Sequence, residues 1–223
     1  MQDKELIYAK ENKDEILQSM VEGIEKPAIK TAIFMAGSPG AGKTEVANTL
    51  SELYKGLVII DADRFREKFP EYNGSNSSRF QKASSWLVEQ AFRFVIANGY
   101  SFILDATFAL ESASKNIRRA YKNDYEISAF YVYQNPIVAW NFTKERQKVE
   151  GRVVPKERFI NAYFKARMNL IKVKKEFPSE FELNIVIKDY DNNISEVHFD
   201  TDNIELILPE IYTLKELEEK LND

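Results

Sequence analysis

One segment of eight residues has the residue types and the spacing that hold a chain of phosphates. It reads Gly37-Ser38-Pro39-Gly40-Ala41-Gly42-Lys43-Thr44 and fits the pattern G-x-x-x-x-G-K-[ST]. Its glycines let consecutive backbone N–H groups wrap around phosphates, and a helix after it adds unpaired N–H groups and the positive end of a dipole. We expect Lys43 to reach the β- and γ-phosphates and Thr44 to offer its hydroxyl to Mg²⁺. The segment predicts a site for a nucleoside triphosphate.

Polar residues come directly after two other apolar runs. Asp61 and Asp63 follow the run 57–60, and Asp105 and Thr107 follow the run 101–104. Because ligands of parallel sheets gather outside the carboxyl ends of the strands, these side chains are expected to converge on the phosphate-binding loop. Asp61 is also expected to cap a helix that begins near residue 62, with a ligand role as the second interpretation.

Two classes of phosphate-binding-loop protein fit the sequence poorly. A switch GTPase reads guanine with N-K-x-D, but the nearest string, 12–15, lies before the loop and ends in Glu15. A motor ATPase usually follows its apolar strand with Asp-Glu, and here Ala106 takes the place of the Glu after Asp105.

A small-molecule kinase fits better. Such an enzyme needs a carboxylate beside the acceptor hydroxyl and arginines near the transferred phosphoryl group. Asp63 suits the first role as a general base, and Arg146 and Arg152 suit the second. Arg146 has a plainer interpretation as the partner of a neighbouring Glu. These residues favour an ATP-dependent kinase that works by in-line transfer.

The elements that must position these residues alternate between strand and helix as far as residue 177. Apolar runs predict strands, and helical periodicity predicts the segments between them. The predicted strands are 31–36, 57–60, 101–104 and 127–133, and the predicted helices are 45–53, 79–97, 111–122, 136–148 and 156–176. This order predicts an α/β, P-loop-kinase-like three-layer fold, with a mostly parallel central sheet and helices on both faces.

A C-terminal hairpin is expected to extend that sheet. The runs 181–188 and 195–199 read as two strands, and Asp191-Asn192-Asn193 between them suits a tight turn. A capping box from Thr213 to Glu216 predicts a closing helix.

Composition limits the remaining possibilities. The 223 residues predict a single domain, 1–223, with an N-terminal helical extension at 1–26. The sequence has no cysteine, so disulfides, thiolate metal sites and a cysteine nucleophile are excluded. His198 is its one histidine, which leaves little material for a Ser-His-Asp triad or a histidine-rich metal site. A net charge of −4 argues against nucleic acid as a partner. Because no apolar run is long enough for a signal peptide or a membrane span, a cytoplasmic location is expected.

From about Ala32 to Phe199, the chain resembles the zeta toxins, P-loop kinases of bacterial toxin–antitoxin systems. The matching elements, in chain order, are the loop 37–44, the I-D-x-D-x-[FY] element at Ile60–Phe65 with Pro70 after it, Glu89, the strand end Asp105-Ala106-Thr107 where the family has E-G-T, the [TI]-x-E-R element at Thr143–Arg146, and the R-x-x-P element at Arg152–Pro155. Asp105 is one methylene shorter than the usual Glu, and the segment between Arg146 and Arg152 is shorter than in plasmid-type members of the family.

The resemblance implies a function and roles for further residues. It implies Mg²⁺- and ATP-dependent phosphorylation of a hydroxyl of UDP-N-acetylglucosamine, with Asp63 as the catalytic base. It implies that Glu89, Asp105 and Thr107 contact this nucleotide sugar. A small helical antitoxin that blocks the ATP site is the implied partner.

The residues themselves leave alternatives open. A kinase or ATP-hydrolysing switch for another acceptor, such as an antibiotic, a nucleoside or a polynucleotide end, has the same motifs. So does a nucleotide-binding interaction protein with little turnover. Glu89 alone reads as a solvated helix residue, and Asp105 has a second interpretation as a carboxylate that holds the ligands of Mg²⁺ in place.

Overall fold

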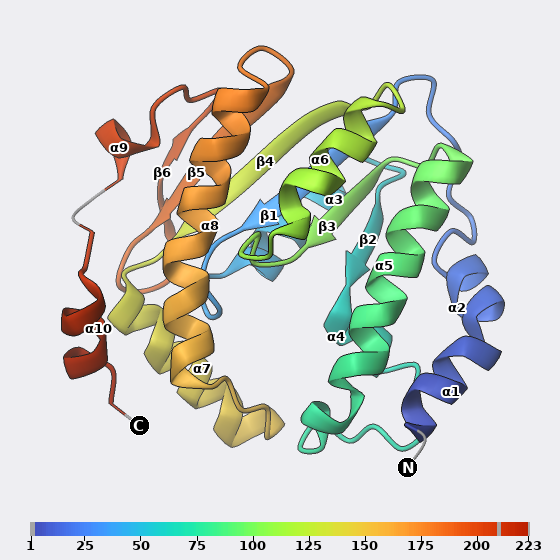
Figure 1. The fold of residues 1–223 in the computed structure, drawn as a ribbon, viewed down its shortest axis with the longest axis horizontal. Helices are drawn as coiled ribbons and strands as arrows, with labels where there is room; N and C mark the ends of the chain where they lie inside the picture. The colour runs from blue at the N-terminus through green and yellow to red at the C-terminus, as the bar shows by residue number, and fades with distance from the viewer. Residues whose placement is uncertain (1–2, 209–210, 223) are drawn as a thin grey trace.

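The computed structural model describes residues 3–208 and 211–222 and has the predicted α/β fold (Figure 1). Its strands are β1 (Thr31–Ala36), β2 (Val58–Asp61), β3 (Phe102–Asp105), β4 (Glu126–Tyr133), β5 (Phe181–Lys188) and β6 (Ile194–His198). Its α-helices are α1 (Lys4–Glu11), α2 (Lys13–Ser19), α3 (Lys43–Leu53), α4 (Ala62–Arg66), α5 (Gln81–Asn98), α6 (Ser112–Tyr121), α7 (Pro136–Glu150), α8 (Lys156–Glu176), α9 (Ile204–Ile207) and α10 (Leu214–Lys220). A 3₁₀ turn at Ser77–Phe80 precedes α5.

The strands form one sheet in the order β2-β3-β1-β4-β5-β6. The first five run parallel, and β6 returns antiparallel to β5 as the predicted hairpin. Asp61 and Asp105, the last residues of β2 and β3, are register partners. The strand ends therefore place two carboxylates side by side at the edge where the phosphate-binding loop follows β1.

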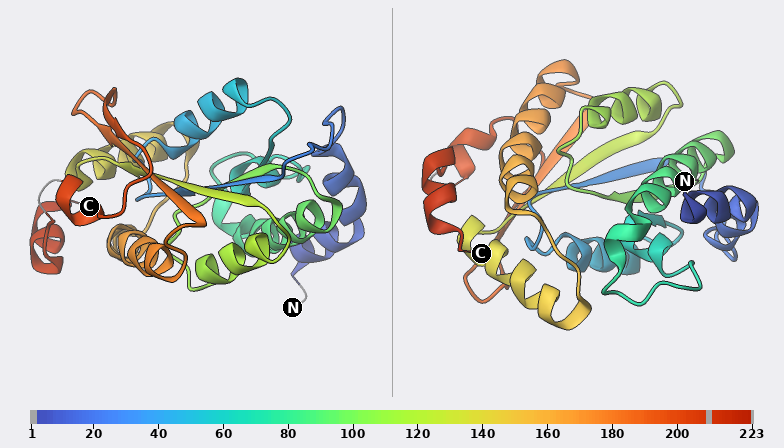
Figure 2. Two further views of the ribbon diagram at one scale, coloured as in Figure 1. Left: turned by 90° about the horizontal axis from the view of Figure 1, so that it is seen from above. Right: turned by 60° about the horizontal axis from the view of Figure 1, so that its bottom comes forward.

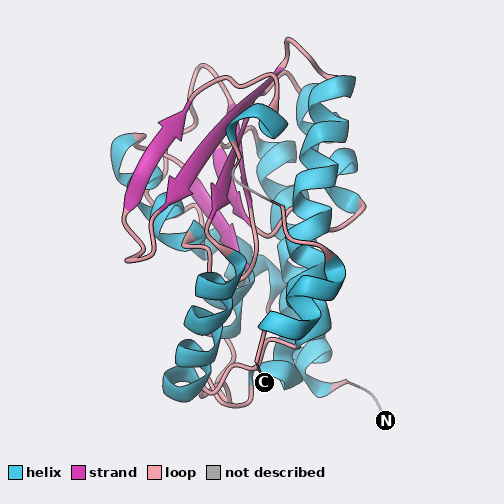
Figure 3. Ribbon diagram, turned by 90° about the vertical axis from the view of Figure 1, so that its left-hand side faces the viewer, coloured by secondary structure: helices cyan, strands magenta, loops and turns pink. Residues whose placement is uncertain are grey.

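Helices cover both faces of the sheet, as predicted. Helices α5, α6 and α8 lie on one face, and α3 lies on the other (Figure 2). Figure 3 shows the sheet with helices on either side. The stripe Ala83, Leu87, Ala91 and Val95 on α5 is completely buried, at the spacing of one helix face. A smaller cluster joins Val46, Ala47 and Leu50 of α3 to the opposite face of β1 and β3.

The N-terminal segment packs on the outside of α5 (Figure 1). Ala9, Ile16, Leu17 and Val21 are buried in the same hydrophobic cluster as the main sheet. Residues 1 and 2 of the predicted extension 1–26 lie outside the described residues. None of the helices described is long and apolar enough to cross a membrane.

Some element boundaries differ from the sequence-based prediction. Helix α3 begins at Lys43, inside the motif and not after it, because the left-handed Gly42 (φ 85°) ends the loop there. Helix α7 continues to Glu150 and stops at Gly151, whose φ is 70°. Helix α9 was not predicted; Asn203 caps this short turn through its side chain. These differences lie at element ends, where single turn residues decide the geometry.

Candidate active site

The phosphate-binding loop joins β1 to α3 and lies against two other elements. A Cβ on Gly40 would come within 2.1 Å of the Ala139 carbonyl oxygen of α7, and a Cβ on Gly37 within 2.3 Å of the Val132 carbonyl oxygen of β4. Both glycines also have positive φ. Side chains are therefore excluded at these positions by contact as well as by backbone conformation. These contacts with β4 and α7 fix the shape of the loop, in which the Gly37 N–H donates to the Thr107 carbonyl oxygen and the Ala41 N–H to that of Ser38.

Lys43 and Thr44, the last two residues of the motif, each donate a hydrogen bond through the side chain. The ammonium of Lys43 donates to the Ser38 carbonyl oxygen at 2.7 Å, within the loop. The hydroxyl of Thr44 donates to Oδ2 of Asp105 at 2.8 Å. Burial lowers the pKa of Lys43, while the nearby Asp105 carboxylate acts in the opposite direction. Lys43, Thr44 and Asp105 thus form one charged group at the start of α3.

Hydroxyl and carboxylate oxygens are the ligands that Mg²⁺ prefers, and this ion usually keeps few protein ligands beside water and phosphate. Thr44 and Asp105 fit that requirement. In residues 3–208 and 211–222, no group of three or more acidic or histidine side chains is arranged to hold a metal ion alone.

The carboxyl groups of Asp61 and Asp105, at the ends of β2 and β3, both have raised pKa values. Asp61 caps α4, as predicted, by accepting from the Asp63 N–H at 3.0 Å. Burial, and then the charge of Asp105, raise the pKa of Asp61 to about 6. Burial also raises the pKa of Asp105, against the opposing effects of Lys43 and the Thr44 hydroxyl. Asp61 and Asp105, half-buried at the paired ends of β2 and β3, form a strand-end cluster with Lys43 and Thr44.

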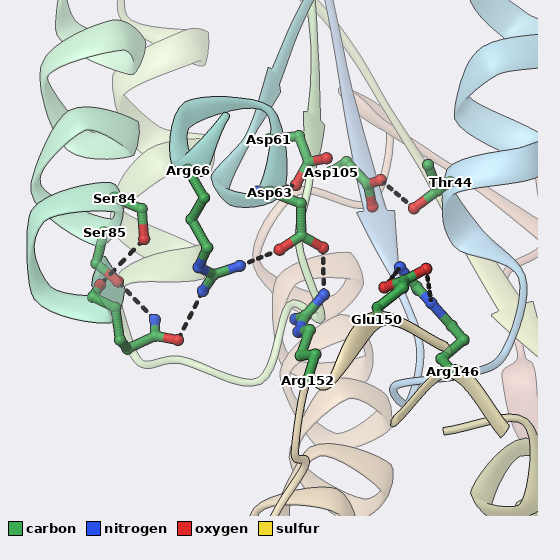
Figure 4. A network of polar contacts seen from close by, with 11 residues as sticks. Thr44, Asp61, Asp63, Arg66, Ser84, Ser85, Asp105, Arg146, Glu150 and Arg152 are labelled. Carbon is green, nitrogen blue, oxygen red and sulfur yellow. Dashed lines mark hydrogen bonds and ion pairs between the residues drawn. The ribbon is translucent and has the colours of Figure 1, made fainter. Parts of the chain in front are cut away.

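Asp63 lies between two guanidinium groups (Figure 4). One oxygen pairs with Arg66, one turn further along α4, and the other pairs with Arg152, beyond the end of α7. The side chain of Arg66 is 2% exposed and also donates to Gln81 of α5 at 2.8 Å. The side chain of Arg152 is 32% exposed. A fixed arginine and a more accessible one thus share the carboxylate.

Arg146 faces the same region but has its own partner. It donates to both carboxylate oxygens of Glu150, one turn later on α7, at 3.2 and 3.1 Å (Figure 4). Its side chain is 49% exposed. Of the two predicted arginines, the structure brings Arg152 to Asp63 and holds Arg146 against Glu150.

A cavity of about 570 Å³ opens beside Asp63. Its wall is formed by α4, the loop before α5 and the end of α7, and its lining residues are Asp63, Glu67, Tyr72, Asn73, Gly74, Ser75, Arg146, Lys148, Val149, Glu150, Gly151 and Arg152. Its size suits a small organic ligand. The lining is polar and contains both arginines, so the cavity suits a ligand with hydroxyl and anionic groups.

Residues 13–214 match the sequence model of a family described as zeta toxin. The chain belongs to the zeta toxin family. It is similar to the toxin PezT of Streptococcus pneumoniae serotype 4, with 26% identity over 157 residues, which cover 63% of this chain and 62% of PezT. The match thus spans less than two thirds of that relative.

Solved structures support the fold of a zeta toxin. A chain of the PezAT chromosomal toxin–antitoxin system of S. pneumoniae superposes with a TM-score of 0.67 and 19% identity, over 99% of this chain and 93% of that one. A chain of AvrRxo1-ORF1:ORF2 with ATP gives a TM-score of 0.58 at 15% identity, over 88% of this chain and 63% of that one.

Two residues that the family resemblance singled out lie outside the polar network around Asp63. Although burial works to raise the pKa of Glu89, hydrogen bonds from Arg93 and Arg119 lower it. The ion pair with Arg93, at 2.8 Å, lies within α5, and the ion pair with Arg119, at 2.9 Å, joins α5 to α6. Thr107 supports the loop through its backbone, since its carbonyl oxygen accepts from the Gly37 N–H at 3.3 Å. Neither residue is among those that line the cavity beside Asp63.

Sequence reasoning missed two basic residues of the site. Arg66 follows Asp63 by three positions in a helix that the cap at Asp61 already predicted, so the spacing placed both on one face. Lys188 is the last residue of β5 and lies against Gly42. Its position at the end of a parallel strand could have indicated this place, but only acidic residues and a threonine were considered at the strand ends.

Proposed function

We propose that this zeta toxin family member is an ATP-dependent kinase that phosphorylates a hydroxyl of a nucleotide sugar, of the UDP-N-acetylglucosamine type, as the toxin of a toxin–antitoxin system. The observation that carries the proposal is the position of Asp63. This carboxylate borders the polar cavity on one side. On the other it is close enough to Asp61 and Asp105 that, in addition to burial, its charge raises their pKa values, Asp105 being the partner of Thr44. A base between an acceptor cavity and a triphosphate loop is the arrangement that phosphoryl transfer requires.

In the proposed reaction, the loop and Lys43 hold the phosphates of ATP, and Thr44 with Asp105 would hold Mg²⁺. Bound there, Mg²⁺ would supply positive charge against the phosphates. Asp63 orients the acceptor hydroxyl and takes its proton as the new O–P bond forms. The bond from the γ-phosphorus to the bridging oxygen breaks, and ADP leaves. The transition state is loose, so positioning and charge supply most of the catalysis.

Arg152 has to exchange partners in this reaction. In the structure its guanidinium pairs with Asp63, the group that must accept the proton. When the acceptor hydroxyl takes that place, Arg152 turns to the equatorial oxygens of the transferring phosphoryl group, with Arg146 beside it. A guanidinium can donate two hydrogen bonds to such a group, which a lysine cannot reproduce.

The acceptor is inferred from the family and from the cavity. Hydroxyl and amide groups of Tyr72, Asn73 and Ser75 suit a sugar, and Lys148 suits a diphosphate. The same cleft leads to the proposed partner. The similar PezAT chain belongs to a toxin–antitoxin system. A small helical antitoxin that covers the strand ends would block ATP binding here.

The test is a panel assay with the purified protein, ATP and Mg²⁺. Candidate acceptors are UDP-sugars, nucleosides, an aminoglycoside and oligonucleotides, and the readout is a mass gain of one phosphate. We expect the gain on UDP-N-acetylglucosamine, loss of activity in Lys43→Ala, and a decrease in kcat of about 10² or more in Asp63→Asn with ATP affinity retained. Arg152→Lys should lose at least about tenfold in kcat. Phosphate gain on a different acceptor only would replace the proposed substrate, and full activity of Lys43→Ala would refute the phosphate site.

A further inference from the structure

A second lysine lies at the phosphate-binding loop. Lys188 ends β5, and its side chain is 8% exposed. A Cβ built on Gly42 would lie 2.7 Å from its ammonium nitrogen and 2.9 Å from its Cε. The ammonium is therefore in contact with the residue that precedes Lys43, at the N-terminal end of α3.

The positive charge of Lys188 is compensated in part within the described residues. Hydrogen bonds from Asn193 and Asp191, and then the charge of Lys188, lower the pKa of the neighbouring Asp189 carboxylate. Its ammonium donates to the Asn192 carbonyl oxygen at 3.0 Å, which uses one of its three hydrogens. None of the ion pairs among residues 3–208 and 211–222 includes Lys188. A buried ammonium is costly unless an anion compensates it, and the adjacent helix N-terminus adds positive potential. An anionic ligand at this place would complete the compensation.

The turn after Lys188 is held in a fixed position against the loop. Asp189 accepts from the Asp191 and Asn193 N–H groups at 3.0 and 2.8 Å, and its own carbonyl oxygen accepts from buried Gln134 at 2.7 Å. Asn192 has φ 67°, and its Oδ1 is buried without a hydrogen-bond partner. This oxygen would lie 3.3 Å from a Cβ on Gly42. An acceptor and a cation thus face the same point of the loop.

We propose that Lys188 and the turn 189–193 form the hairpin side of the nucleotide site. There Lys188 binds the α-phosphate, and Asn192 accepts a hydrogen bond from the nucleoside. Lys43 serves the β- and γ-phosphates from inside the loop, whereas Lys188 approaches from the β5–β6 hairpin, on the far side of Gly42. This inference rests on the proposed ATP site and adds a residue that the G-x-x-x-x-G-K-[ST] motif does not contain.

The binding test uses the dissociation constants of ATP, ADP and adenosine, measured by calorimetry at one fixed low salt concentration. Lys188→Met should weaken ATP and ADP by the same factor, about tenfold or more for a charge-assisted hydrogen bond, and leave adenosine within about twofold. Lys55→Met, which removes one exposed lysine, is the charge-matched control and should bind all three ligands as the parent does.

Asn192→Asp tests the hairpin side of the nucleotide site without removing the lysine. Aspartate tolerates the positive φ of this position and places a carboxylate beside the ammonium, so the hairpin should remain folded while ATP affinity falls at least about tenfold. Normal ATP affinity in folded Lys188→Met or in Asn192→Asp overturns the proposal. If Lys43→Met loses ATP binding while both hairpin variants keep it, the phosphate-binding loop is confirmed and the proposed role of the hairpin is wrong. If Lys43→Met also binds ATP normally, the proposed function itself fails.

Discussion

The two arginines at Asp63 differ in what holds them. Arg66 is fixed from both sides, because it lies one helical turn from Asp63 and its other nitrogen is bound to Gln81. Its Nε is buried without a partner, a cost that the surrounding contacts must offset. Arg152 has no second hydrogen-bond partner within the described residues and is about one third exposed. Arg66 thus sets the position of the carboxylate, and Arg152 is the arginine that can leave it.

Asp61 gives the strand-end cluster a measurable pH dependence. Its pKa is about 6 in the folded protein against 3.8 for an unperturbed carboxyl group, so the folded state binds this proton more tightly than the unfolded state. The stabilising effect is complete below pH 3.8 and is lost as the pH rises through about 6. Asp61→Asn keeps a capping side chain but has no charge, so we expect it to be more stable than the parent at pH 8 by about 1–3 kcal/mol.

Urea unfolding without nucleotide, at pH 4 and pH 8, measures this difference. The two proteins should have nearly the same free energy of unfolding at pH 4, and the gap should open between pH 4 and pH 7. Asp3→Asn is the matched control, because it also changes an N-cap carboxylate but lies on α1, outside the cluster. A constant difference at both pH values would show that Asp61 ionises freely in the folded protein.

At the scale of elements, the cavity is bounded by a contact between two loops. A Cβ on Gly151, after α7, would lie 2.5 Å from the Cα of Ser75, and one on Gly74 would lie 2.8 Å from the Glu150 carbonyl oxygen. The backbones of the loop before α5 and of the α7–α8 connection therefore touch. Both segments line the cavity beside Asp63. Their separation should change the proposed acceptor site and not the phosphate-binding loop.

Gly151→Ala tests this contact. The added methyl group cannot fit against Ser75, so the two loops should move apart, and we expect the acceptor KM to rise about tenfold while the dissociation constant of ATP stays within about twofold. Gly23→Ala is the control, since Gly23 has a similar φ, 73° against 70°, but nothing within 4 Å of an added Cβ. Both variants should lose about 1–2 kcal/mol of stability from the left-handed backbone. A KM change of the same size in Gly23→Ala would show that strain, and not the loop contact, is responsible.

For the whole molecule, the sequence predicted what depends on periodicity and strand ends. The order of strands and helices, the cap at Asp61 and the closing hairpin follow from local patterns, and the structure confirms them. The sequence did not predict that Arg152 reaches Asp63 from 89 positions away, or that Lys188 meets Gly42. Such pairings depend on how α7 and β5 pack across the sheet edge, and no local spacing encodes that distance.

A partner that covers this edge of the sheet and ATP must each weaken the binding of the other. Binding free energies are reciprocal, so if the proposed antitoxin weakens ATP binding by a given factor, saturating ATP must weaken antitoxin binding by the same factor. We expect a factor of about 10² or more when the partner fills the nucleotide cleft, since direct overlap leaves no ternary complex. The measurement is the affinity of a small helical protein encoded beside this one, with and without saturating ATP and Mg²⁺. Lys43→Ala is the control, because it should bind the partner with an affinity that ATP no longer changes. If the parent binds the partner equally well with and without ATP, the antitoxin acts at a different surface, and the cleft at the strand ends serves substrates alone.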